Sequence, residues 1–272
     1  MNNTFVFSRL VRLINRQWIG FGKIYLMALG IIAGIFVAFF SFRIYQVAQS
    51  QNLEDISTIF SFRPYLFTVI GMAFLSIVSS SYFSVLGQKS KAITEILIPA
   101  SRTEKFISAL FYTALLTTVS YVLLFYIIDF SFVSYVRSRF EASPVFISPD
   151  TDKGFNLNRL NYFFQIPLAD EIYWLLFLPF LSSAVFLLGS IYFNNFQFIK
   201  TAIIIVVYGA LYAIFMVKIM EWYTSDTVSI VTDSGAFFNQ ESNIIKSFCT
   251  VGILVTLLIW GISFLRLKEK EV

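Results

Sequence analysis

The chain alternates between long apolar runs and shorter polar segments. Six runs are long enough to cross a bilayer: Phe21–Phe42, Tyr65–Leu86, Phe106–Phe130, Tyr173–Phe193, Phe198–Met220 and Ile244–Leu265. A helix needs about 20 mostly apolar residues to span the roughly 30 Å hydrocarbon core. Because the runs are continuous, they do not fit the alternating strands of a transmembrane barrel. The pattern predicts an all-α membrane protein with six transmembrane helices. Only residues 194–197 separate the fourth and fifth runs, which predicts a tight hairpin.

An amphipathic segment precedes the first run. From Phe5 to Gly20, the basic residues Arg9, Arg12 and Arg16 recur every three or four positions on one helical face, and Trp18 belongs to the apolar face. This pattern predicts a helix lying in the cytoplasmic membrane interface within residues 1–20. The alternative is a basic flank that only sets topology. A cleaved signal peptide is rejected, because the first apolar run is longer than a signal h-region.

The distribution of charge orients the spans. With the N-terminus inside, the cytoplasmic segments hold twelve of the 20 Lys and Arg but only four of the 16 Asp and Glu, a local charge of +8 that leaves −4 outside. Cytoplasmic segments of membrane proteins carry the excess of Lys and Arg. We therefore expect six spans with both termini in the cytoplasm.

The composition is that of a protein surrounded by lipid, and it excludes several kinds of catalytic and metal site. Hydrophobic residues make up 57% and charged residues 13% of the 272 residues, and the charged share is about half that of a soluble domain. The chain has no His and a single cysteine, Cys249, which excludes His-dependent nucleophilic catalysis and a cysteine-based metal cluster. No GxxxxGKS or GxxxxGKT phosphate loop occurs. We expect no catalytic, cofactor or metal site in this chain, and no nucleic-acid partner.

The outer segments and span ends carry several isolated features. Residues 131–172 form a long outer loop, predicted as a small folded cap or as helices lying on the outer leaflet. Asp129 ends the third span, where we expect its carboxylate to stay solvated. Lys218 and Glu221 are expected to form an interfacial pair. Gly30 and Gly34 give the first span a small-residue face suited to packing against another span or a second copy.

The loop at residues 87–105 is the most informative cytoplasmic segment. Pro99 ends a short apolar stripe that includes Leu97, and Ser101 with Glu104 three residues later has the spacing of a helix capping box. The sequence predicts a short helix, a proline corner, and then the third span. The ordinary alternative is a loop that carries topogenic charge, and the functional alternative is a rigid element offered to a cytoplasmic partner.

This loop carries a family resemblance. The run from Thr94 to Glu104, read as Thr94, Glu95, Ile96, Leu97, Ile98, Pro99, Ala100, Ser101, Arg102, Thr103 and Glu104, resembles the first cytoplasmic loop of type 2 ABC transporter permeases. The position after the second of six spans and the interfacial helix before the first are also similar to that family. The long outer loop departs from the family pattern, and so does the polar segment between the last two spans.

The resemblance implies a single transmembrane permease domain over residues 1–272, the membrane subunit of an ABC exporter in a bacterial cytoplasmic (inner) membrane. A separate cytoplasmic ABC ATPase would bind ATP and Mg, and a second permease copy or a sister permease would complete the complex. The loop would be the coupling helix, with Glu95, Arg102, Glu104 and the N-terminal arginines as polar contacts of the ATPase. A second hypothesis is a non-transport scaffold or assembly factor that recruits partners through the loop at residues 131–172.

Overall fold

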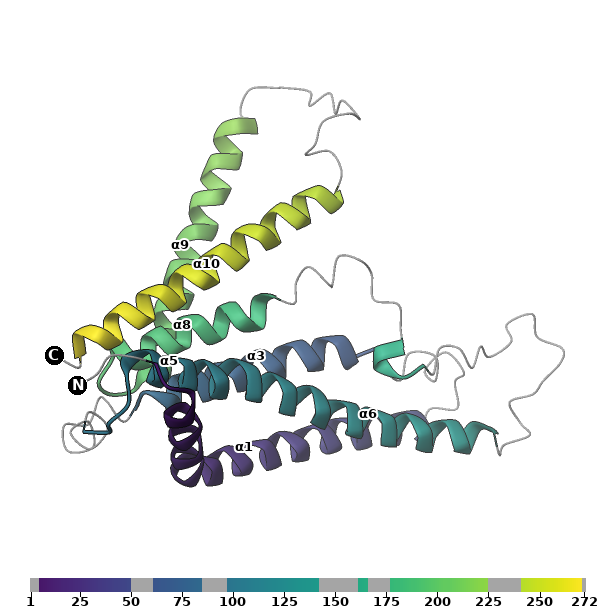
Figure 1. The fold of residues 1–272 in the computed structure, drawn as a ribbon. Coiled ribbons are helices and arrows are strands. Elements are labelled where there is room, and N and C mark those ends of the chain that lie inside the picture. Colours follow the sequence, from purple (N-terminus) through teal and green to yellow (C-terminus); the bar gives the residue numbers. More distant parts are fainter. Residues whose placement is uncertain are drawn as a thin grey trace. The chain divides into compact units, whose positions relative to one another are not determined.

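The computed structural model describes residues 5–49, 61–84, 97–141, 161–165, 177–224 and 241–270. Within these ranges the chain is helical and contains no strand. The elements in chain order are α1 (Phe7–Gln49), α3 (Arg63–Tyr82), α5 (Arg102–Leu110), the π-helix η2 (Phe111–Leu116), α6 (Thr117–Glu141), the 3-10 helix η5 (Phe163–Gln165), α8 (Leu178–Tyr192), α9 (Gln197–Thr224) and α10 (Glu241–Lys270). Figure 1 shows their course.

Five helical stretches are long and apolar enough to cross a membrane, which confirms the predicted all-helical membrane architecture at this level. They are Phe7–Gln46, Arg63–Tyr82, Arg102–Ser138, Gln197–Ile219 and Lys246–Glu269. The fourth predicted span corresponds to α8, whose 15 described residues extend about 22 Å, less than a bilayer core. Its predicted start at Tyr173 lies outside the described residues. The described residues thus contain five helices of spanning length and one shorter apolar helix.

Two helices run further than the apolar pattern predicts. The expected interfacial helix and first span form one continuous α-helix, α1, of 43 residues, and the first turns of α1 bend away from the remainder (Figure 1). The predicted third span begins at Arg102 and continues through η2 and α6 to Glu141. Helix propensity does not stop at the edge of the bilayer, and the mixed polar and apolar residues after Phe130 still extend α6 by three turns.

The chain divides into two compact units. In the unit that contains residues 75–114 and 169–272, α8 packs against both α9 and α10, and α10 also contacts α5. Its core cluster consists of Phe83, Ala109, Leu187, Ile191 and Leu267. Small polar side chains also meet between its helices, since Ser79 and Ser183 share a buried hydrogen bond of 2.8 Å between hydroxyl oxygens. Such small-residue contacts are typical of helix packing in lipid.

The second unit, residues 11–74 and 115–168, has an aromatic core. Its rings come from α1, α3, α6 and η5, and they pack mostly edge to face or tilted with centroids 4.9–5.8 Å apart. The rings are those of Phe36, Phe67, Tyr121, Phe125 and Phe163. Phe125 is fully buried at the centre. Aromatic pairs in these arrangements contribute beyond their buried area, so part of the abundant Phe content forms a protein core.

Residues 193–196 form the turn of the predicted hairpin between α8 and α9, and the packing of these helices confirms it. Phe196 holds a positive φ of 54°, a conformation that is strained for a large side chain. The side-chain amide of Gln197 donates from Nε2 to the backbone oxygen of Asn194 across 3.1 Å. At the close approach of the two helices, a Cβ on Gly189 would lie 2.0 Å from Thr201 Oγ1, so only glycine fits there.

A second close approach generates a stability test. A Cβ on Gly252 would lie 2.1 Å from a ring carbon of buried Phe177, whereas Gly261 on the same helix has nothing within 4 Å of that position. We expect Gly252→Ala to lower the free energy of unfolding by about 1–3 kcal/mol through overpacking. Gly261→Ala should leave it unchanged or raise it by up to about 1 kcal/mol. Thermal unfolding of both variants in detergent measures the contrast, and equal melting temperatures would contradict it.

Candidate functional site

The site begins with the start of α5, which the chain fixes by local hydrogen bonds. Ser101 is the N-cap, with extended backbone angles that leave its hydroxyl facing the first turn. Its Oγ accepts from the Glu104 backbone amide at 3.3 Å, and Glu104 Oε2 accepts from the Ser101 amide at 2.8 Å. The predicted capping box is therefore confirmed. These bonds satisfy amides that the helix itself leaves unpaired.

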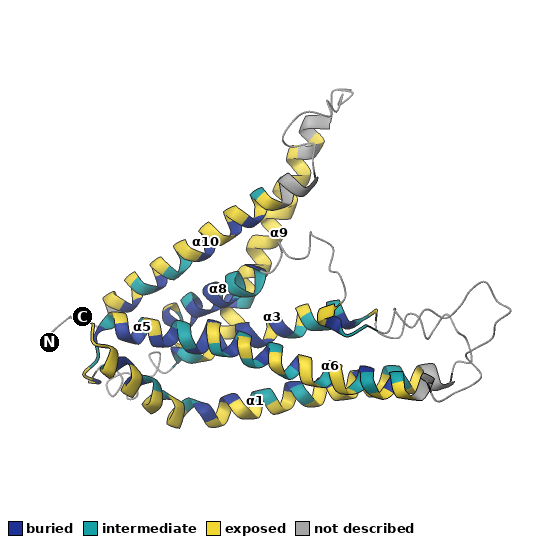
Figure 2. Ribbon diagram, turned by 45° about the vertical axis from the view of Figure 1, so that its right-hand side comes forward, coloured by how far each residue is buried: buried dark blue, intermediate teal, exposed yellow. Residues whose placement is uncertain are grey.

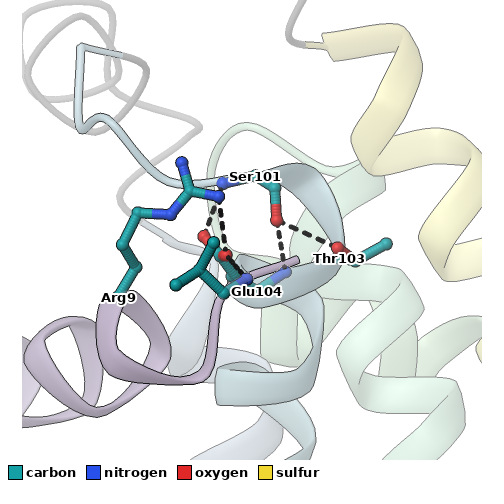
Figure 3. A network of polar contacts seen from close by, with 5 residues as sticks. Arg9, Ser101, Thr103 and Glu104 are labelled. Atoms are coloured by element: carbon teal, nitrogen blue, oxygen red, sulfur yellow. Dashed lines mark hydrogen bonds and ion pairs between the residues drawn. The ribbon is translucent and has the colours of Figure 1, made fainter. Parts of the chain in front are cut away.

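The other carboxylate oxygen of Glu104 binds the start of α1. Oε1 accepts from the backbone amide of Val6 at 2.7 Å and lies 3.2 Å from Arg9 Nη2 (Figure 3). The Glu104 side chain is 0% exposed, whereas that of Arg9 is 32% exposed. One buried carboxylate thus joins two segments 98 residues apart in sequence. Because a buried charge is stabilised by pairing and hydrogen bonding, this arrangement fixes the start of α1 against the end of the loop.

The predicted loop residues divide into buried and outward-facing groups. Thr94 and Glu95 lie outside the described residues. Leu97 is 72% exposed and Pro99 is also exposed. Ser101 and Glu104 are buried, and Arg102 is half-buried. The structure therefore brings Ser101 and Glu104 together as an internal support, and it presents Leu97 and Pro99 on the outside. Glu104, expected to contact the ATPase, has both oxygens engaged within the chain.

The predicted interfacial residues also separate. Arg9 pairs with Glu104 as described, while Arg12, Arg16 and Trp18 are exposed. Figure 2 shows exposed positions along much of α1. Gly30 and Gly34 are exposed as well, and no described atom lies within 4 Å of where their Cβ atoms would be. The described residues therefore place nothing close against these two glycines, and packing against another span or a second copy stays a prediction.

The structure contains a buried ion pair, Arg63 with Asp129, that the sequence pattern does not predict. Asp129 was expected to be solvated, but its side chain is 2% exposed, and so is that of Arg63. Arg63 Nη1 lies 2.9 Å from Asp129 Oδ1. That prediction was wrong because it treated the end of the third span as the edge of the protein, whereas α6 continues to Glu141 and chain from the outer loop covers the carboxylate.

The same pair holds a piece of the long outer loop. Both terminal nitrogens of Arg63 donate to the Asn161 carbonyl at 3.0 Å, and Asp129 Oδ2 accepts from the Phe163 amide at 2.8 Å. Phe163 then enters the aromatic core beside Phe67 and Phe125. The sequence did contain an indication of this pair, because Arg63 and Asp129 are opposite charges at the outer ends of two neighbouring predicted spans.

Lys218 and Glu221 form their predicted pair. It is exposed, with 2.7 Å between Lys218 Nζ and Glu221 Oε2.

The described residues offer no group of three or more metal-ligating side chains. The capping box and the pair of Glu104 with Arg9 hold two segments in place, and the loop end at Leu97 and Pro99 faces outward. Comparison of the chain with protein-family models, curated proteins and solved structures finds no match.

Removing the Glu104 charge tests the internal support. We expect Glu104→Gln to lower the free energy of unfolding by about 1.5–3 kcal/mol, because hydrogen bonds to a charged group are lost. Hydrogen exchange should accelerate at the Val6–Leu10 amides. Glu269→Gln removes a carboxylate from the exposed pair with Arg266 and should cost no more than about 1 kcal/mol. If the two variants behave alike, Glu104 does not hold α1.

The Arg63–Asp129 pair generates a second test, by double-mutant cycle. Asp129→Asn leaves the Arg63 guanidinium buried without its counter-charge, and we expect a loss of about 3–5 kcal/mol. The combined change Arg63→Met with Asp129→Leu should cost less than Asp129→Asn alone, because no unpaired charge remains. Thermal or denaturant unfolding of these two variants and of the single variants Arg63→Met and Asp129→Leu completes the cycle. Strict additivity would show that the two side chains are not coupled.

Proposed function

We propose that the chain is the membrane-spanning permease subunit of an ATP-binding cassette exporter, with six spans and both termini in the cytoplasm of a bacterium. A separate cytoplasmic ATPase binds ATP and Mg and hydrolyses ATP. A second copy or a sister permease completes the transporter in the cytoplasmic membrane. The proposal rests on the loop resemblance together with the helical membrane architecture.

The observation that favours this proposal is the way the loop end is held. Leu97 and Pro99 face outward directly before a capping box whose residues are buried. The fixed start of α5 gives these two side chains a rigid base, and α5 continues through η2 into α6. A partner that binds the exposed loop end can therefore push or pull α5 at its fixed start. Glu104 supports this function from inside as a positioning residue.

A second candidate is a membrane scaffold that recruits partners through its outer loop. The anchoring of Asn161 and Phe163 by Arg63 and Asp129 favours it, because it gives part of that loop a fixed position. In this case deletion within residues 142–160 would abolish function and leave any ATPase association intact. For the exporter, ATPase association depends on the cytoplasmic loop instead.

Co-purification from native membranes tests the exporter proposal. The unaltered chain should bring down an ATPase with a Walker phosphate loop. Leu97→Glu replaces an exposed apolar contact with a charge, and we expect it to lower the recovered ATPase at least tenfold, since a charge at an apolar contact strongly opposes binding. Lys268→Glu, also exposed and expected on the same side of the membrane, is the control and should retain the ATPase. Absence of any such ATPase from the unaltered complex would refute the proposal.

A further inference from the structure

Three basic side chains stand exposed in a row near the start of α1. They are Arg12, Arg16 and Lys23, and all three are exposed. At 100° per residue they fall within about 40° of one another around the helix. The row extends over about three helical turns, so three cationic groups lie on one side of the helix near its start.

The row has no counter-charge on its own helix. None of the 43 residues of α1 is acidic. The Glu104 carboxylate reaches the same part of the chain, but it pairs with Arg9 and is fully buried. Arg9 is thus paired with an acidic side chain of the protein, while the three residues of the row face outward. Uncompensated cationic charge on a surface attracts anionic ligands.

A second, apolar face of the same helix indicates the depth at which the row lies in the membrane. Phe7, Val11 and Trp18 are exposed apolar side chains, and they also fall within about 40° of one another, roughly 140° around the helix from the row. The Trp18 ring lies over Gly22, whose missing Cβ would be 3.0 Å from the indole. Exposed Trp side chains concentrate at the level of lipid headgroups, so Trp18 places the row at that depth.

We propose that Arg12, Arg16 and Lys23 bind the headgroup phosphates of anionic phospholipids. Phe7, Val11 and Trp18 face the membrane, with the Trp18 ring at the level of the headgroups. The basic row on the other side of the helix then faces the headgroup phosphates, and its charge is complementary to a lipid with net negative charge. The family resemblance assigns the N-terminal arginines to an ATPase. The geometry separates these arginines into two groups. Arg9 pairs with Glu104, and the exposed row binds lipid. This inference does not depend on an ATPase partner.

Lipid selectivity of the purified full-length chain tests the proposal. The chain is exchanged into mild detergent with phosphatidylglycerol or phosphatidylcholine of identical acyl chains, and retained lipid is measured by native mass spectrometry. We expect the unaltered chain to prefer phosphatidylglycerol. In the triple variant Arg12→Gln, Arg16→Gln and Lys23→Gln that preference should fall by roughly tenfold or more, because each basic residue near an anionic surface contributes a several-fold factor. Added salt should weaken the preference of the unaltered chain for phosphatidylglycerol, because it screens the charges of the row.

The control removes the same charge from elsewhere. Lys200, Lys218 and Lys268 are exposed and form no row, and changing all three to Gln should preserve most of the preference. Unchanged melting in phosphatidylcholine shows that both variants fold. The proposal is overturned if the unaltered chain retains the two lipids equally, or if both triple variants lose the same preference. Displacement of lipid by inorganic phosphate alone would also overturn it, since the site would then bind free phosphate.

Discussion

A charge that leaves water must be paired, and two buried carboxylates determine much of this structure. Glu104 and Asp129 are each almost completely enclosed, and each has both of its oxygens occupied. In both cases one oxygen meets an arginine and the other accepts from a backbone amide. Leaving either carboxylate unpaired in a low-dielectric interior would cost several kcal/mol, about the net stability of a small domain. The segments that supply the partners are therefore held in place with comparable strength.

The two carboxylates do different work. Glu104 joins the start of α1 to the first turn of α5, next to the exposed end of the cytoplasmic loop. Asp129 joins α3 and α6 to the outer segment at Asn161–Phe163. One fastens a terminal helix, and the other fastens part of a long loop. Each gives a fixed position to a segment that an apolar pattern alone would leave undetermined.

Local signals in the sequence predicted more than long-range ones. The apolar runs located the helices, the Ser101 and Glu104 spacing gave the capping box, and the polar residues at 194–197 gave the hairpin, because each depends on residues within one turn of one another. The Glu104–Arg9 contact and the Arg63–Asp129 pair join residues 95 and 66 positions apart. The periodicity of apolar residues along the chain does not predict ion pairs between residues so far apart. Helix ends were also misjudged, since hydropathy marks where lipid ends and not where α1 or α6 ends.

Lipid accounts for the surface that the protein leaves uncovered. Along α9, no residue of the apolar window is buried within the chain, and its exposed side chains include Ile203, Val206, Leu211 and Phe215. In water such a helix would be an aggregation site, because large exposed apolar patches associate. In a bilayer the same surface is solvated, and its hydrogen bonds are satisfied within the helix.

The π-helix η2 changes which residues of α5 and α6 lie on the same helical face. Each turn of η2 takes in more residues than an α-turn, so the angular count that relates positions in α5 to positions in α6 is shifted. Two side chains seven residues apart across Phe111–Leu116 do not share a face, although the same spacing within α6 would place them together. A face of α5 therefore cannot be extended into α6 by counting residues in steps of three and four.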